Sequence, residues 1–394
     1  MVSLENLKPL FSTFAILSSS LYLSHMNSKK YNNTKLFLSI SESLLTFILL
    51  FIFVWSGLSR SFESHLSVYA KNDYLLFLLF VLTTGLCFAV IFSPFSFYGG
   101  FILEHKYKLS NQTFFQWIWE SAKGVLVSLL IGLPILLFFF YLIRLYGENW
   151  WLPFAVFLFV VSVILARIVP VFILPLFYKI VPLENEDLKE RIVHLAKIAN
   201  IKVENVFTFN MSKTTKKANA AFTGLGKSKR VLLGDTLLEN YSLDEVETVL
   251  AHEFGHYKKK HIIKNIFLGT FFSFFTLFLI AKLYSLSLPY FHARTLAQIY
   301  VLPVLALWGM LVSLLIQPLL NMVSRKYEYE ADAFAIETTG KHEAFLQTLD
   351  KLTEQNLGDK EPHPFVEWFF YSHPSITKRR NAILSFVKNK NGQS

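Results

Sequence analysis

Long apolar stretches separated by short polar segments are the dominant pattern along this chain. A hydrocarbon core about 30 Å thick needs roughly 17 to 25 mostly apolar residues in a helix, and stretches near that length recur between the charged residues. The chain is therefore predicted to be an all-α membrane protein with seven transmembrane helices. The predicted spans are 9–24, 43–59, 74–92, 125–143, 150–177, 265–281 and one within 295–324.

Proline and glycine are expected to interrupt two of these spans. After the third, an uncharged run continues through Pro94, Gly99 and Gly100, where a loop or re-entrant turn is predicted. The fifth contains Pro170 and Pro175 in its second half. Because proline removes a helix hydrogen bond, that end is predicted to be kinked or interfacial.

The basic residues between the spans predict an orientation. With seven alternating spans, one side receives Lys29, Lys30 and Lys35 after the first span, Lys106 and Lys108 after the third, and a lysine-rich segment after the fifth. Cytoplasmic loops carry the excess of Lys and Arg in membrane proteins. That side, together with the C-terminus, is predicted to be cytoplasmic.

The 179–263 segment breaks the apolar pattern and is long enough for a small folded α+β unit. Residues 183–201 have the spacing of an amphipathic helix, and two strand-like runs follow, the second a hairpin turning at 226–229. A last helix is predicted after Ser242, with Glu245 completing a capping box. The predicted division of the chain is 1–178, 179–263, 264–324 and 325–394.

Composition agrees with a membrane protein and narrows the chemistry. Hydrophobic residues make up 53% of the 394 residues and charged residues only 17%. The single cysteine, Cys87, excludes a disulfide-stapled scaffold and a cysteine-built metal site. The net charge of +10 is assigned to cytoplasmic loops, so no nucleic-acid partner is expected. Any metal is therefore expected on histidine and carboxylate ligands.

The helix after Ser242 contains an HExxH motif, His252-Glu253-Phe254-Gly255-His256. A spacing of four residues puts both imidazoles on one helix face, where they can converge on a single Zn²⁺. Glu253 is then placed to act as general base on a water molecule. The alternative is a membrane-interface helix in which the histidines are polar neighbours of residues 258–260.

A catalytic zinc site of this type needs a third protein ligand, and Glu328 is the candidate. It follows the seventh span in SRKYEYEADAFA, on the side predicted for the HExxH helix. Glu328 and Asp332 share one helix face, whereas Glu330 points about 160° away and is the alternative ligand. The competing interpretation is a solvated acidic face paired with Arg325 and Lys326.

HEFGH followed far downstream by EYEAD, with seven predicted spans, resembles the integral-membrane zinc CAAX prenyl proteases of the gluzincin type. The family pattern recurs in ANAAFTG, in KRVLLGDTLL, at His261 and in SHPS, and the similarity covers most of the chain. The resemblance implies a barrel of seven helices around a large water-filled chamber. It also implies a small α+β zinc metalloprotease domain on the cytoplasmic side, with cleavage inside the chamber.

The resemblance also implies roles for individual residues. His252, His256 and Glu328 would hold one Zn²⁺ per chain, and Glu253 would be the catalytic base. Asp332 would accept a hydrogen bond from a ligand imidazole and fix its tautomer.

The resemblance also implies that residues near the C-terminus and in one predicted strand contact the substrate. His373, in YSHPS, would stabilise the oxyanion, although a histidine in a surface loop is the alternative. Asn219, Ala220 and Phe222 resemble the edge strand that would bind an extended peptide, the alternative being an ordinary hairpin. Arg379 fits the pattern too, either pairing near the site or capping a helix.

The predicted function is that of an integral-membrane zinc metalloendopeptidase of the CAAX type, with a peptide or protein substrate, prenylated or not, and the lipid bilayer as partners. A broad quality-control zinc protease is the first alternative, and a non-catalytic chamber or transport protein the second. Glu253 argues against the second, because a structural zinc site has no use for it. A short chain without a dilysine signal favours a bacterial inner membrane over the endoplasmic reticulum.

Overall fold

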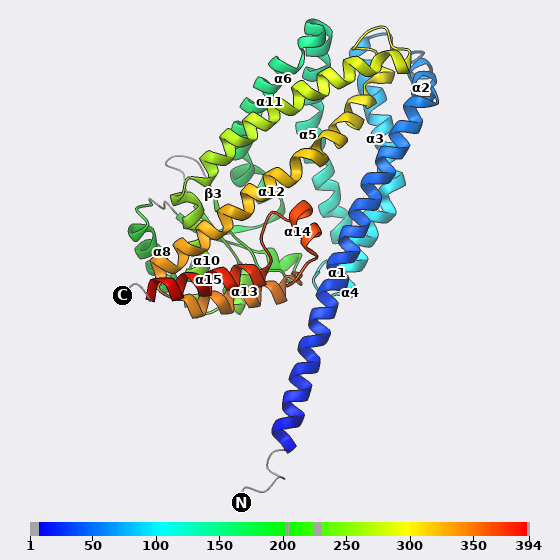
Figure 1. Cartoon of the computed structure of the whole chain (residues 1–394). Helices are drawn as coiled ribbons and strands as arrows, with labels where there is room; N and C mark the ends of the chain where they lie inside the picture. The colour runs from blue at the N-terminus through cyan, green and yellow to red at the C-terminus, as the bar shows by residue number, and fades with distance from the viewer. Residues whose placement is uncertain (1–7, 202, 204, 224–229, 392–394) are drawn as a thin grey trace, which may run out of the picture.

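The computed structural model describes residues 8–391 except 202, 204 and 224–229, and for 8–25, 222, 223 and 391 it describes the backbone only. Long helices run beside one another, and a smaller α/β unit lies at one end of them (Figure 1). The helices are α1 (Lys8–Trp55), α2 (Leu58–Leu66), α3 (Asp73–Phe97), α4 (Leu103–Lys106), α5 (Phe114–Tyr146), α6 (Trp151–Ile168), α7 (Leu174–Phe177), α8 (Glu186–Ile198), α9 (Asp235–Asn240), α10 (Leu243–Lys258), α11 (His261–Ser287), α12 (Pro303–Thr339), α13 (His342–Gln355), α14 (Pro364–Phe370) and α15 (Ile376–Asn391).

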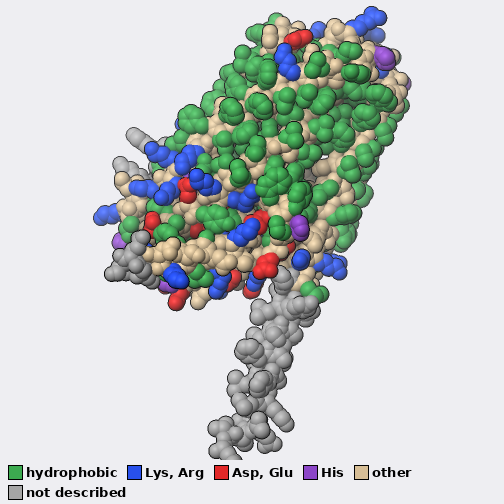
Figure 2. Space-filling view, in the orientation of Figure 1, with side chains coloured by type: hydrophobic (Ala, Val, Ile, Leu, Met, Phe, Trp, Pro, Cys, Tyr) green, Lys and Arg blue, Asp and Glu red, His purple; other side chains and the backbone are tan. Residues whose placement is uncertain are grey.

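Six helices within the described residues are long and apolar enough to cross a membrane. On the face shown in Figure 2, hydrophobic side chains cover most of the long helices, while charged side chains gather on the α/β unit and at the opposite end of the helices. Side chains as large as Phe37 and Phe172 are 69% and 67% exposed, which suits contact with lipid rather than water. The spans are Met26–Trp55, Asp73–Lys106, Phe114–Asn149, Trp151–Phe177, His261–Phe291 and Ile299–Thr339.

The predicted count of seven spans is not confirmed, and the loop expected between the first two is wrong. Helix α1 runs without a break through both predicted stretches, so Lys29, Lys30 and Lys35 lie in a helix. No proline or glycine occurs between residues 10 and 55 to end it. Its polar residues have partners instead, since Asn32 Nδ2 donates to Leu357 O at 2.6 Å and Lys35 pairs with Glu104 at 2.6 Å.

The loop expected after the third span is also wrong. Helix α3 continues through Pro94 into a π-helical turn, Tyr98–Ile102, and then into α4. A Cβ atom on Gly99 would lie 3.3 Å from Leu38, and one on Gly100 3.2 Å from Trp117. These glycines allow close packing rather than a turn. Near Pro170, where a kinked or interfacial end is predicted, the helix changes to a second π-helical turn, Val169–Ile173.

The small unit contains a four-stranded sheet ordered β1-β2-β4-β3, with β2 and β4 parallel and the other pairs antiparallel. The predicted hairpin is confirmed as β3 and β4, although its turn lies outside the described residues. Strand β1 was not anticipated, and Ile198, the last residue of α8, is 54% exposed. The strands are β1 (Ile180–Pro182), β2 (Asn205–Phe209), β3 (Ala220–Thr223) and β4 (Arg230–Gly234).

The polar segments after α4, α7 and α12 lie at one end of the long helices, as the sequence predicted. Ser110, after α4, forms an isolated β-bridge with Thr215 of the small unit, and Lys216 N donates to Leu109 O at 2.8 Å. The α/β unit is therefore tied to the membrane helices along its edge.

Helix α10 packs closely along the end of α12. The predicted capping box is confirmed, because Ser242 accepts from Glu245 N and the Glu245 side chain accepts from Ser242 N. Near the other end of α10, a Cβ atom on Gly255 would lie 3.0 Å from Ala331 Cα and 3.2 Å from Phe334 Cβ. The missing side chain is what permits this approach.

We expect Gly255→Ala to lower the thermal unfolding midpoint of the detergent-solubilised protein. Its methyl group would meet α12 backbone, and overpacking of this kind costs about 1–3 kcal/mol, more than alanine's helix preference returns. Gly269→Ala in α11 is the matched control, because nothing lies within 4 Å of its Cβ position. An unchanged midpoint for Gly255→Ala would contradict the close packing.

Candidate active site

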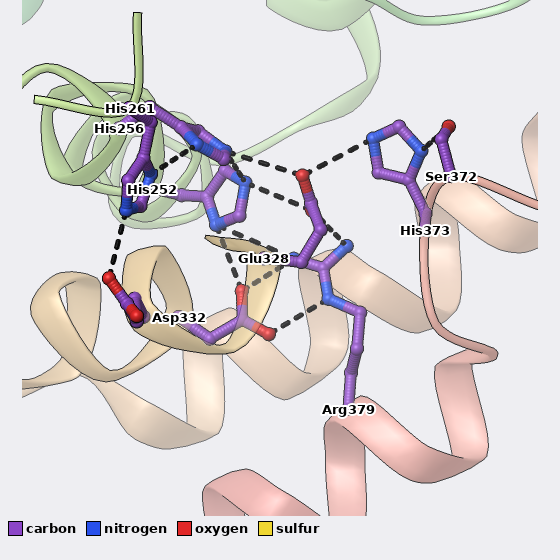
Figure 3. Close-up of polar contacts among 9 residues, drawn as sticks. His252, His256, His261, Glu328, Asp332, Ser372, His373 and Arg379 are labelled. Atoms are coloured by element: carbon purple, nitrogen blue, oxygen red, sulfur yellow. Dashed lines mark hydrogen bonds and ion pairs between the residues drawn. The ribbon is translucent and has the colours of Figure 1, made fainter. Parts of the chain in front are cut away.

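Two imidazoles from α10 and one carboxylate from α12 converge at the junction of the two helices. The Nε2 atoms of His252 and His256 are 3.1 Å apart. Each is 3.4 Å from a Glu328 oxygen (Figure 3). One potential ligand atom from each residue lies within 4.8 Å of the other two. Helical spacing aligns the histidines, and the packing at Gly255 brings the carboxylate to them.

These three side chains fit a tetrahedral metal ion. Ligands about 2.0–2.1 Å from zinc stand about 3.3 Å from one another in a tetrahedron, close to the observed separations. Glu328 is buried, 4% exposed, and its Oε2 atom makes no hydrogen bond with the described residues, although His252 Nε2 lies 3.4 Å and Arg379 Nη1 3.5 Å from it. A buried carboxylate oxygen without a donor is costly, and a bound cation would satisfy it. Two histidines and a glutamate are also a known catalytic zinc set.

Asp332 and Arg379 support His252 from behind. Asp332 Oδ1 lies 2.9 Å from His252 Nδ1, so it accepts from the ring and leaves Nε2 free to bind a metal. Arg379, on α15, donates to both Asp332 oxygens, from Nε at 2.8 Å and from Nη2 at 2.5 Å. Arg379 thus pairs near the site, one of the two roles open from the sequence.

The electrostatic field at His252 favours positive charge. Burial lowers the pKa of His252, but the nearby carboxylates of Asp332 and Glu328 outweigh burial and raise the pKa to about 9. Carboxylates that stabilise an imidazolium in this position would equally stabilise a divalent cation between the same groups.

Glu253 borders a cavity of roughly 260 Å³ beside the cluster. Its half-buried carboxylate makes no hydrogen bond or ion pair with any residue the structure describes, so it is available to a substrate or water. The cavity lining also includes Ala218, Asn219, Ala220, His252, Glu328, Asn356, His373 and Arg379.

His373 reaches the cluster from the loop after α14. Its Nε2 atom is 3.4 Å from Glu328 Oε1, and its Nδ1 atom is 3.0 Å from Ser372 Oγ. The side chain is 64% exposed and lines the cavity. The structure thus brings His373 to the same carboxylate as the two α10 histidines.

Strand β3 forms the edge of the sheet beside this cavity. Asn219 is exposed just before the strand, and its carbonyl accepts from Gly234 N at 3.0 Å. Ala220 pairs with Leu233 of β4, and β3 pairs with no other strand among the described residues. Phe222 lies in the strand, but its side chain is outside the described residues.

Asn356 is a cavity residue that sequence reasoning missed. Its Oδ1 atom accepts from Ala218 N at 2.9 Å, and its Nδ2 atom donates to Ala218 O at 3.2 Å. This paired contact holds the chain entering β3. A lone asparagine after α13 carries no spacing signal, so only the folded chain reveals it.

Comparison with known proteins matches both parts of the chain to family models. Residues 182–387 match the model of peptidase family M48. Residues 22–179 match the CAAX prenyl protease N-terminal model, described as five membrane helices. The two matches meet where the small α/β unit begins.

Similar proteins extend over most of the chain. A Bacillus subtilis protein named uncharacterized metalloprotease YhfN is 32% identical, over 89% of this chain and 83% of that protein. CAAX prenyl protease 1 of Saccharomyces cerevisiae is 33% identical, over 75% of this chain and 69% of its own. The crystal structure of S. mikatae Ste24p superposes with a TM-score of 0.79 at 28% identity, covering 91% of this chain and 89% of that one. This multi-pass membrane protein therefore belongs to peptidase family M48.

Proposed function

We propose that the chain is an integral-membrane zinc metalloendopeptidase of the CAAX type. The observation that carries the proposal is the convergence of His252 and His256 with Glu328 around one point, beside the free carboxylate of Glu253. A structural metal site would be closed by a fourth protein ligand and would not need that carboxylate. The M48 match agrees with peptide hydrolysis.

His252, His256 and Glu328 would hold the metal, and zinc suits this nitrogen and oxygen set. When bound, zinc supplies Lewis-acid polarisation of a carbonyl and makes water more acidic. Asp332 keeps the His252 proton on Nδ1, and Arg379 keeps Asp332 charged and oriented. Asp332 and Arg379 thus fix the orientation of the His252 ring and the nitrogen that carries its proton.

The remaining cavity residues would carry the proton and substrate steps. Glu253 would take a proton from the attacking water and later pass it to the leaving amine. His373 would donate a hydrogen bond to the oxyanion that forms at the scissile carbonyl. Strand β3, from Ala220 on, would bind an extended peptide along its unpaired edge and hold the scissile bond beside Glu253.

The finer features of the family remain part of this proposal. The TM-score of 0.79 with Ste24p supports a shared helix arrangement, which the family resemblance places around a large chamber. The basic residues on the side of the small unit support a cytoplasmic location for it and for the C-terminus. Yeast CAAX prenyl protease 1 supports prenylated C-terminal peptides as substrates. The Bacillus subtilis relative supports a bacterial inner membrane rather than the endoplasmic reticulum.

Glu253→Gln should lower the rate of peptide cleavage by about 10²- to 10⁴-fold, the usual value of a general base. Zinc content should stay near that of the parent protein, because Glu253 is not among the metal-binding group. Glu247→Gln is the control on the same helix, since Glu247 pairs with Lys341 instead. Cleavage at the parent rate by Glu253→Gln would rule out the proton-transfer role.

Glu328→Ala should lose bound zinc, measured as metal content after dialysis, because only two histidine ligands remain. Glu330→Ala should keep about one zinc per chain when zinc is saturating, since Glu330 contacts His261 rather than the cluster. The opposite pattern, with zinc retained by Glu328→Ala and lost by Glu330→Ala, would identify Glu330 as the third ligand.

The substrate class can be tested with farnesylated and unmodified forms of one CAAX-ended peptide. We expect cleavage that a zinc chelator abolishes, with a higher kcat/KM for the farnesylated form. Equal cleavage of both forms would point to a broad quality-control protease. If the zinc-loaded protein cleaved neither peptide, the proposed peptidase activity would be contradicted.

A further inference from the structure

His261 is a buried histidine next to the metal cluster that the catalytic steps leave unused. It is the first residue of α11 and is 1% exposed. Its Nδ1 atom lies 3.0 Å from Nδ1 of His256, and its Nε2 atom lies 3.0 Å from Glu330 Oε2 (Figure 3). Its ring stacks on Tyr327 with 4.1 Å between centroids and 9° between planes.

His261 is not a fourth ligand. The metal-binding group comprises His252, His256 and Glu328 without it. One ring nitrogen faces Glu330, and the other faces the side of the His256 ring opposite to the Nε2 atom that meets the cluster. Both of its polar atoms are therefore engaged away from the metal position.

The contacts fix where each proton lies. Two Nδ1 atoms 3.0 Å apart can form a hydrogen bond only if one carries a proton and the other does not. His256 presents Nε2 to the metal, so its proton is on Nδ1 and is donated to His261. His261 then holds its own proton on Nε2 and donates it to Glu330, which can only accept.

We propose that His261 is a positioning residue for the metal ligand His256, and that Glu330 positions His261. The contact sets the tautomer and the ring plane of His256, as Asp332 does for His252. This inference rests on the proposed zinc centre and extends it to a residue without a role there. Partners of this kind typically change metal affinity by 10- to 100-fold.

The two histidine ligands are then supported in different ways. His252 is backed by a carboxylate that an arginine neutralises, whereas His256 is backed by a neutral ring. The residues that support His256 come from two different helices, because His261 begins α11 and Glu330 belongs to α12. Two membrane-spanning helices therefore meet behind one metal ligand.

A packing role is the alternative, because His261 is buried against Tyr327. Two substitutions separate the alternatives. His261→Phe keeps an aromatic ring for stacking but removes the acceptor for His256. His261→Asn removes the ring but places an amide oxygen near the former Nδ1 position, where it can still accept. If His261 acts through its hydrogen bond, the Asn variant should bind zinc more tightly than the Phe variant. If it acts through packing, the Phe variant should bind zinc more tightly.

The test measures the zinc affinity of full-length, detergent-solubilised proteins by competition with a chelator, without any peptide substrate. We expect His261→Phe to raise the Kd for Zn²⁺ by about 10- to 100-fold. His261→Asn should bind zinc more tightly than His261→Phe, and Glu330→Ala should weaken binding less than His261→Phe does. Size-exclusion profiles and thermal unfolding of the zinc-free proteins check folding, with His261→Leu replacing an unfolded Phe variant.

The inference would be overturned if His261→Phe bound Zn²⁺ as tightly as the parent protein. It would also be overturned if His261→Phe bound Zn²⁺ more tightly than His261→Asn. In either case the proposed protease would stand. A parent protein that binds zinc with this order of variants but cleaves no peptide would support the positioning role while contradicting the proposed function. A parent that binds no zinc would overturn both.

Discussion

The close contact between α10 and α12 is the constraint on which the rest of this molecule depends. Helix α10 belongs to the small α/β unit, whereas α12 rises directly from a membrane span. Their close packing at Gly255 brings Glu328 to the α10 histidines, which are remote in sequence. The uncharged stretch of α12 ends at Ser324, and Glu328 lies four residues beyond it, about 6 Å along the helix. The site is therefore held at a fixed short distance from the apolar part of the molecule.

Buried charge is the second organising feature. Glu328 and Asp332 are 4% and 2% exposed, and burying two carboxylates together is unfavourable unless positive charge is close. Arg379 supplies one positive charge, which hydrogen-bonds to Asp332 and lies 3.5 Å from one Glu328 oxygen, and the histidines face Glu328 as well. The arrangement is more readily understood as one prepared for a divalent cation than as a self-contained network.

The sequence was most informative where a local rule has a single geometric consequence. Apolar stretch lengths predicted the later spans, Ser242 and Glu245 predicted a helix start, and helical spacing put His252 beside His256. Prediction from the sequence failed where the structure around a residue depends on partners that are distant along the chain. Polar residues of α1 remain helical because Glu104 and Leu357 satisfy them, and the contacts of Asn356 and His261 exist only after folding.

The α/β unit is discontinuous, which bears on how the chain is made. Its hydrophobic core joins Ile192 and Phe254 to Phe345 and Ile383, and the α11–α12 hairpin lies between these groups in sequence. During synthesis, the first part of the α/β unit cannot complete its hydrophobic core until α11 and α12 have inserted and the segment after α12 has been made. Assembly in the bilayer thus becomes a checkpoint, because a chain that has not finished insertion lacks both a closed core and a complete site.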